Sequence, residues 1–144
     1  NSNGQVVISG KTNDIDQFIF ELKKLNIKSI KLPVSAPFHC PLMNSATKIM
    51  NKELNQTKFS PPKNMIVSNV TAEPSSDPDS LRSLLIEQIE SPVRWRESII
   101  NMIKSGNKKF IEIGPGKVLS GLIKRIDRNV ELIQVNNIKD LNNL

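Results

Sequence analysis

The sequence has little of the chemistry on which metal and disulfide sites depend. Its 144 residues include one histidine, one cysteine, one tryptophan and no tyrosine. One histidine and one cysteine are too few ligands to hold a metal ion, so we expect no metal site. A single cysteine excludes an internal disulfide, which favours a reducing compartment such as the cytoplasm.

Long apolar runs and base-stacking side chains are also scarce. No run approaches the roughly 18–20 apolar residues that span a bilayer, so we expect no membrane association. The net charge of +6 favours an acidic partner. However, the basic residues are scattered and only five phenylalanines and one tryptophan could stack on bases, so we expect no nucleic-acid binding.

Helical and strand patterns alternate along the chain. The periodicity predicts strands at 5–8, 27–32, 65–70, 109–113 and 130–135. It predicts helices at 15–25, 43–54, from Asp79 or Ser80 to 89, 95–103 and 118–125. Residues 12–14 offer caps for the first helix, which Asn26 ends. This alternation is typical of an α/β fold with parallel strands.

The segment 33–43 contains the only histidine, the only cysteine and three prolines. The prolines exclude a regular helix or an inner strand, so we expect a shaped connection that presents His39 where a helix begins. Histidine is the side chain whose unperturbed pKa lets it exchange protons near neutrality, so His39 is our candidate base. A histidine that only hydrogen-bonds within a loop is the simpler alternative. Cys40 is a weaker candidate nucleophile, because adjacent side chains seldom face each other.

A second candidate site is the turn Gly114-Pro115-Gly116-Lys117, between a predicted strand and a predicted helix. Such a turn can bind phosphate at a helix N-terminus, but the spacing is not that of a P-loop. A sharp turn in which glycines let the backbone bend is therefore the favoured interpretation. The chain also has no Gly-x-Ser-x-Gly elbow, so it supplies no nucleophilic serine of that kind for His39 to serve.

Five segments in order resemble the C-terminal half of the malonyl-CoA:acyl carrier protein transacylase family of bacterial fatty acid synthesis. They are GQVVISG at 4–10, LPVSAPFHCPLM at 32–43, VSNV at 67–70, Gln88 with SPVRWRES at 91–98, and EIGPGKVLSGL at 112–122. The resemblance implies an α/β fold in two parts. Residues 1–33 would be the second half of a ferredoxin-like small subdomain, and residues 34–144 the C-terminal part of an α/β-hydrolase-like large subdomain.

The resemblance also implies an activity. A serine would take malonyl from coenzyme A and pass it to the phosphopantetheine thiol of an acidic acyl carrier protein, with no cofactor besides the coenzyme A thioester substrate. His39 would be the general acid and base, and the main-chain carbonyl of Gln88 would orient its ring.

Further site residues follow from the same resemblance. Phe38 and Asn1 would lie at the substrate, and the bulk of Phe38 would disfavour an α-methyl branch on the acyl group. Lys28 and Lys31 would dock the carrier protein, although a solvated strand face explains both lysines equally well.

The family's nucleophile elbow, malonate-binding arginine and oxyanion-hole glutamine precede the stretch that this chain resembles. Because the chain also lacks an initial methionine, we expect a fragment of a longer reading frame, inactive alone and monomeric when complete. We expect the fragment to expose a sheet edge and apolar faces. The alternative is a standalone carrier-protein or coenzyme A binding module without catalysis, and an upstream Gly-His-Ser-x-Gly would favour the enzyme.

Overall fold

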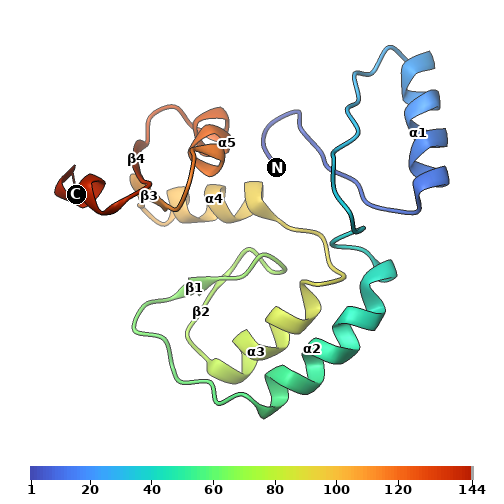
Figure 1. The fold of residues 1–144 in the computed structure, drawn as a ribbon. Coiled ribbons are helices and arrows are strands. Elements are labelled where there is room, and N and C mark those ends of the chain that lie inside the picture. The colour runs from blue at the N-terminus through green and yellow to red at the C-terminus, as the bar shows by residue number, and fades with distance from the viewer. Residues whose placement is uncertain (144) are drawn as a thin grey trace.

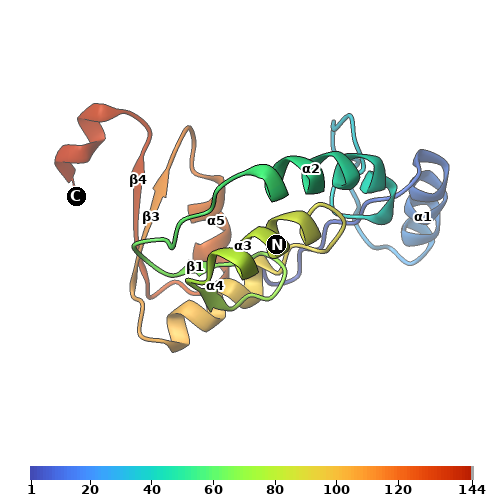
Figure 2. The same ribbon diagram turned by 90° about the horizontal axis from the view of Figure 1, so that it is seen from below.

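The computed structural model describes residues 1–143 and contains helices and short strands in three groups (Figure 1). The first group is α1 (Thr12–Lys24) with the irregular segments on either side of it. The second contains η1 (Pro41–Met43), α2 (Asn44–Gln56), β1 (Ile66–Val67), β2 (Pro74–Ser75) and α3 (Pro78–Glu87). The third contains α4 (Trp95–Lys104), β3 (Lys109–Ile113), α5 (Val118–Ile126), β4 (Glu131–Val135) and η2 (Ile138–Asn143). Figures 1 and 2 both show α1 at the opposite end of the molecule from β3 and β4.

The third group is a parallel βαβ unit, as the sequence predicted. Strands β3 and β4 pair in register from Lys109 with Glu131 to Ile113 with Val135, and α5 connects them. Helix α4 packs against α5, and Ile99 on α4 is only 1% exposed. Burying one such side chain is worth about 1.5–3 kcal/mol, so the interface of α4 with α5 and the sheet is the main core.

Helices α2 and α3 pack side by side in the second group (Figure 2). The Asp77 carboxylate accepts a hydrogen bond from the Ser80 N–H at 2.8 Å, and Pro78 fills the first helical position, where no N–H is needed. The helix therefore begins one or two residues before the predicted start at Asp79 or Ser80, and it ends at Glu87, close to the predicted end at 89. The end of α3 carries Gln88.

Two predicted strands are wrong. Residues 5–8 and 27–32 have no regular secondary structure, and Val6 and Ile30 are 84% and 72% exposed. A strand needs a hydrogen-bonded neighbour, and within residues 1–143 the two segments have only an isolated bridge between Ser2 and Gln5. The helix between them is correct, and Asn26 ends it in the left-handed region at φ 56°. Its predicted caps lie inside it, because the cap is Lys11.

The predicted buried strand at 65–70 is also mostly wrong. Only β1 forms, in a two-residue antiparallel pairing with β2, and Ile66 is about half exposed. The chain turns away after it, because the Ala72 N–H donates to the Ser68 carbonyl at 2.9 Å. Ala72 is fully buried at φ 62°, so this turn is a fixed part of the fold.

The remaining elements agree with an α/β fold. Helices α2, α4 and α5 and strands β3 and β4 lie within a few residues of their predicted positions. The chain after β4 forms η2, and Leu144 lies outside the described residues. In the part of the chain that the structure describes, no helix has the length and apolar character to cross a membrane.

Candidate active site

His39 lies in an irregular loop between α1 and α2, in an unusual backbone conformation. Its φ of 62° falls in the left-handed region, where a non-glycine residue costs about 1–3 kcal/mol and persists only when its surroundings hold it. The His39 N–H donates to the Ile89 carbonyl at 3.2 Å, and the Cys40 thiol donates to the Pro37 carbonyl at 3.1 Å. Helix α2 begins at Asn44, after the short η1, so the ring precedes the helix by a full turn rather than sitting on its first residue.

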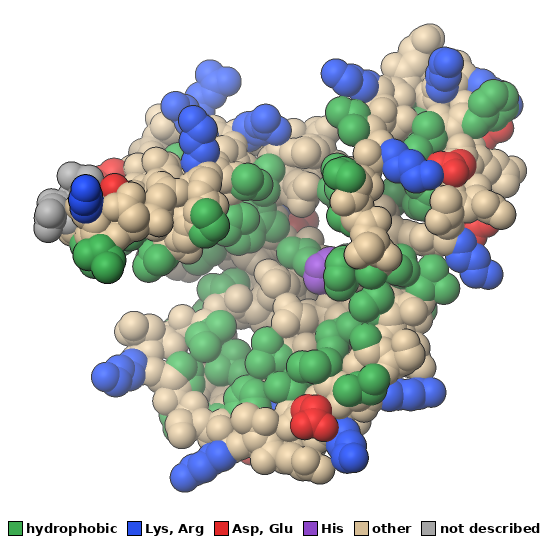
Figure 3. All heavy atoms as spheres, in the orientation of Figure 1, with side chains coloured by type: hydrophobic (Ala, Val, Ile, Leu, Met, Phe, Trp, Pro, Cys, Tyr) green, Lys and Arg blue, Asp and Glu red, His purple; other side chains and the backbone are tan. Residues whose placement is uncertain are grey.

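The imidazole of His39 contacts the end of α3. Its Nδ1 lies 2.8 Å from the main-chain oxygen of Gln88. A carbonyl oxygen only accepts hydrogen bonds, so Nδ1 carries the proton and a neutral ring keeps a lone pair on Nε2. Among residues 1–143, no side chain or main-chain group bonds Nε2, and the ring is exposed between the second and third groups (Figure 3). This geometry suits a base that acts on a group from outside the described chain.

Gln88 is itself held by a residue that the sequence did not single out. The Asn69 Nδ2 group donates to the Gln88 side-chain oxygen at 3.1 Å. The Asn69 carbonyl accepts from the Arg94 N–H at 2.8 Å. Three of the segments that carried the resemblance therefore meet at His39, those at 32–43, 67–70 and 88–98. Membership of VSNV was the only sequence signal for Asn69, and it gave no role.

An apolar cavity of about 380 Å³ adjoins Gln88 in the second group. The side chains around it come from the segment before β1, from β1 itself and from α3, and include Phe59, Ile66, Leu81, Leu84 and Leu85. Ile66 and Leu85 are also exposed large hydrophobics, so the cavity opens on an uncovered apolar surface.

Comparison with known proteins identifies the family of this chain. Residues 1–140 match the family described as the acyl transferase domain. The chain belongs to this family. A malonyl CoA-acyl carrier protein transacylase from Staphylococcus aureus (strain COL) is 39% identical over 142 residues, which cover 98% of this chain and 46% of the relative. The resemblance found in the sequence is thereby confirmed, and the chain spans about half the length of the curated relatives it matches.

Solved structures agree with this membership. An acyl carrier protein S-malonyltransferase from Vibrio cholerae superposes with a TM-score of 0.87 at 37% identity, covering 93% of this chain and 44% of that one. A type II PKS acyl-carrier protein in complex with its malonyl-transacylase gives 0.86 at 32% identity, covering 92% and 43%. The α/β fold of this acyl transferase chain is therefore shared with malonyl-transferring enzymes.

The other predicted site residues of this acyl transferase chain are exposed and lie apart from the His39 contacts. Phe38 precedes the histidine and is 51% exposed. Lys31 pairs with Asp16 of α1 at 2.7 Å, and Lys28 is also exposed. Asn1 is exposed, and no hydrogen bond or ion pair within residues 1–143 joins any of these four residues to His39.

The segment that follows Asn1 contacts the third group. Asn3 accepts a hydrogen bond from Arg96 Nε of α4 at 2.6 Å, and it donates to the Arg125 carbonyl of α5 at 3.3 Å. Gln5 accepts from Arg125 at 3.2 Å. Asn1 therefore begins a segment that is fixed on α4 and α5 rather than on the histidine loop.

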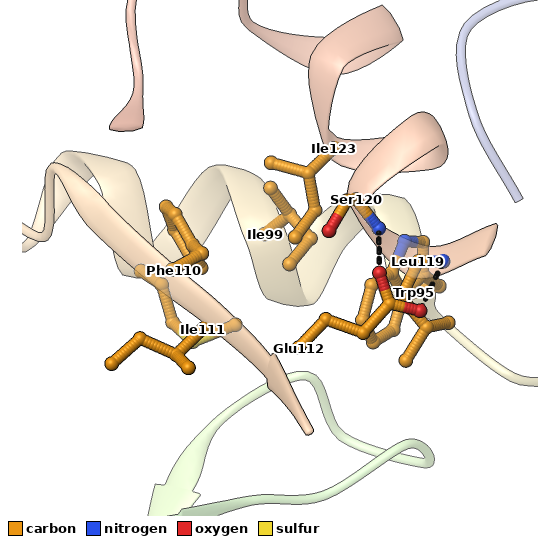
Figure 4. Close-up of a pocket in the computed structure, with 9 residues that line it drawn as sticks. Trp95, Ile99, Phe110, Ile111, Glu112, Leu119, Ser120 and Ile123 are labelled. Carbon is orange, nitrogen blue, oxygen red and sulfur yellow. Dashed lines mark hydrogen bonds between the residues drawn. The ribbon is translucent and has the colours of Figure 1, made fainter. Parts of the chain in front are cut away.

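The glycine turn at 114–117 is a structural turn and not an anion site. Figure 4 shows the Glu112 carboxylate accepting from the N–H groups of Leu119 and Ser120, at 3.0 and 2.8 Å. Gly114 and Gly116 have φ of 137° and 93°, which only glycine adopts readily. A protein carboxylate thus occupies the N-terminus of α5, where a phosphate would have to bind.

The hydrogen bonds that Glu112 accepts also change the pKa of its carboxyl. Desolvation raises the pKa of this carboxyl, but the hydrogen bonds from the Ser120 hydroxyl and from the main chain at Ser120 and Leu119 outweigh it. The net effect holds the pKa of Glu112 below its ordinary value. The carboxylate also lines an apolar cavity of about 120 Å³ with Trp95 and Phe110 (Figure 4), which places Trp95 at the core and not on a substrate surface.

Proposed function

We propose that this chain is the C-terminal part of an enzyme that transfers malonyl from coenzyme A to acyl carrier protein, and that His39 is its general acid and base. The observation that carries the proposal is the 2.8 Å contact between His39 Nδ1 and the Gln88 carbonyl, together with an Nε2 that no group among residues 1–143 bonds. The family membership and the names of the relatives support the same activity. In this proposal residues 1–33 belong to a small ferredoxin-like subdomain and residues 34–144 to the large subdomain.

The first half-reaction uses a serine supplied by another part of the enzyme. His39 Nε2 takes the serine hydroxyl proton while the oxygen attacks the thioester carbonyl carbon of malonyl-CoA. The C–S bond then breaks, and the imidazolium returns the proton to the departing coenzyme A thiolate. The Gln88 carbonyl holds the ring and faces its developing positive charge, which is the role a carboxylate has in a Ser-His-Asp triad.

The second half-reaction reverses these steps with a different thiol. His39 takes the proton of the phosphopantetheine thiol as its sulfur attacks the malonyl-serine carbonyl. The ester C–O bond breaks and the serine oxygen regains the proton. Phe38, next to the histidine and half exposed, would limit space beside the acyl α-carbon and favour malonyl, and Asn1 would contact the substrate from the segment fixed on α4 and α5.

An acidic carrier protein suits the charge of this chain. The net charge is +6, and Lys28 and Lys31 are exposed near α1. The structure of a malonyl-transacylase bound to its acyl-carrier protein is among the similar folds. We place the docking of the carrier protein on this basic surface, where complementary charge would speed the encounter.

The test uses the complete protein that carries this chain. Substituting His39→Ala should lower the rate of malonyl transfer by about 10²–10⁴-fold, because the proton transfer loses its catalyst. The His39 ring is exposed, so water can replace its bond to the Gln88 carbonyl and stability should change little. Asn55→Ala on the exposed side of α2 removes a similar surface hydrogen bond and should leave the rate unchanged.

Two results would contradict the proposal. One is unchanged malonyl transfer by the His39→Ala protein. The other is a wild-type protein that binds coenzyme A or carrier protein but forms no malonyl-enzyme, as a binding module without catalysis would.

A further inference from the structure

We infer that Asn69 is a positioning residue for His39 and that it acts through Gln88. The inference rests on the proposed function of His39, although its decisive measurement needs no turnover. The segment 67–70 then has a role besides packing. It fixes the orientation of the imidazole and selects which of its two nitrogens carries the proton.

Gln88 makes two separate contacts, one through its main chain and one through its side chain. Its main-chain oxygen accepts from His39 Nδ1 at 2.8 Å, and its side-chain oxygen accepts from Asn69 Nδ2 at 3.1 Å. Gln88 directly follows Glu87, the last residue of α3, and caps the helix with φ −61° and ψ −18°. Helix ends fray because their last carbonyls have no partner in the helix, so the direction of this carbonyl needs support from outside α3.

Asn69 can give that support because it is itself fixed to α4 and to the connection before it. Its carbonyl accepts from the Arg94 N–H at 2.8 Å, and the Arg94 guanidinium donates to the Thr71 carbonyl at 3.0 Å. The Asn101 amide of α4 donates to the Ala72 carbonyl at 3.1 Å. The loop at 68–72 is therefore anchored at several points, and Asn69 extends that anchor to the end of α3.

The consequence concerns the protonation pattern of the ring. A neutral imidazole can carry its proton on either nitrogen, and the acceptor beside Nδ1 selects the form in which Nε2 is a base. A Gln88 carbonyl that turns away removes this selection. Asn69→Ala should therefore lower the population of the Nδ1–H form and misalign Nε2, without touching any substrate-binding group.

The experiment measures the ring directly. In the complete protein labelled with ¹⁵N-histidine, the His39 signals are those that disappear in His39→Ala, and their nitrogen shifts report the tautomer. We expect the Nδ1–H form to dominate in the wild type and to lose population in Asn69→Ala. The matched control is Asn55→Ala, which removes an amide bond to Asn51 on α2 and should leave the His39 signals unchanged.

Kinetics provide the second measurement. Asn69→Ala should lower kcat about ten- to a hundredfold, the effect of a small misplacement of a reacting group, with KM for malonyl-CoA unchanged. Gln88→Ala, which keeps the carbonyl but removes the side chain, should lower kcat by a similar factor. The double variant should be no slower than either single one, because both remove the same contact.

A structural role alone would give different results. Asn69→Leu has a side chain of similar size that cannot donate a hydrogen bond. It therefore separates the loss of the hydrogen bond from the effect of the cavity that Asn69→Ala leaves. An unchanged tautomer in Asn69→Ala and Asn69→Leu, or losses that multiply in the double variant, would overturn the inference. Unfolding of both Asn69 variants, together with an unchanged tautomer in Gln88→Ala, would also overturn it.

The two proposals can fail separately. If malonyl transfer is absent but Asn69→Ala still shifts the tautomer, the proposed function fails and the positioning role stands. If His39→Ala abolishes transfer while Asn69→Ala leaves the ring unchanged, the function stands and the positioning role fails.

Discussion

The ring of His39 is held by the main-chain oxygen of Gln88, a residue 49 positions later in the chain, at 2.8 Å. No side-chain carboxylate among residues 1–143 bonds the ring, so its orientation depends on where α3 ends. The Asp77 cap at one end of α3 and Asn69 at the other end fix that helix in place. Elements that look purely structural thus set the geometry of the candidate base.

The core between α4, α5 and the sheet should be the most sensitive part of the chain to truncation. Ile99 is 1% exposed, so Ile99→Ala should lower the free energy of unfolding by about 2–5 kcal/mol through lost burial and a residual cavity. Urea unfolding of the complete protein measures this change. Lys104→Ala is the matched control on the same helix: Lys104 is exposed, and its loss should change stability by less than about 0.5 kcal/mol. Equal effects of the two variants would contradict the placement of the core.

The Glu112 carboxylate should make stability depend on acid pH. Its pKa is lowered in the fold, so its contribution to stability is present above the unfolded pKa and is lost as pH falls through the folded value. Glu112→Gln should therefore cost about 0.5–2 kcal/mol near pH 7, the range for a lost helix cap, and less near pH 3, where more of the carboxyl is protonated. Denaturant unfolding at the two pH values measures the difference. A cost that is the same at both pH values would show that the charge of Glu112 has no part in holding α5.

Carrier-protein docking should depend on the charges near α1. In the complete protein, Lys28→Glu with Lys31→Glu should raise KM for the carrier protein several-fold at low salt and less at high salt, because salt screens exposed charges. Malonyl-enzyme formation from malonyl-CoA should be unaffected, which separates docking from chemistry. Lys139→Glu makes a charge reversal at η2, far from α1 in Figure 1, and should have no effect. If the Lys28 and Lys31 variant behaves like Lys139→Glu, these two lysines belong to a solvated face only.

The chain expressed by itself should expose apolar surface. Ile113 on β3 is 79% exposed, and the cavity beside Gln88 opens next to exposed Ile66 and Leu85. Exposed patches of this kind are typical of surfaces that other parts of a protein cover. We expect the 144-residue chain to bind a hydrophobic dye and to form large species in size-exclusion chromatography. The complete protein should do neither, and a dye-free, monomeric 144-residue chain would contradict this expectation.

Local patterns predicted the helices well, because helical periodicity and turn residues act over a few neighbouring positions. The helix at 12–24 and its end at Asn26 followed from apolar spacing, and so did α2, α4 and α5. The strand predictions succeeded only at β3 and β4, where α5 returns the chain to a parallel partner. At 5–8 and 27–32 the same apolar signal gave no strand, since pairing depends on a second segment that sequence pattern cannot supply.

The sequence by itself determined which side chain could be the base, because it contains one histidine, set among prolines that exclude regular structure. It also determined the family, through five segments in order. Only the tertiary structure decided what each segment does. It joined His39 to Gln88 and Gln88 to Asn69 across long separations, and it filled the N-terminus of α5 with Glu112. The physical reason is that hydrogen bonds act over about 3 Å, and only the packing of helices brings distant residues that close.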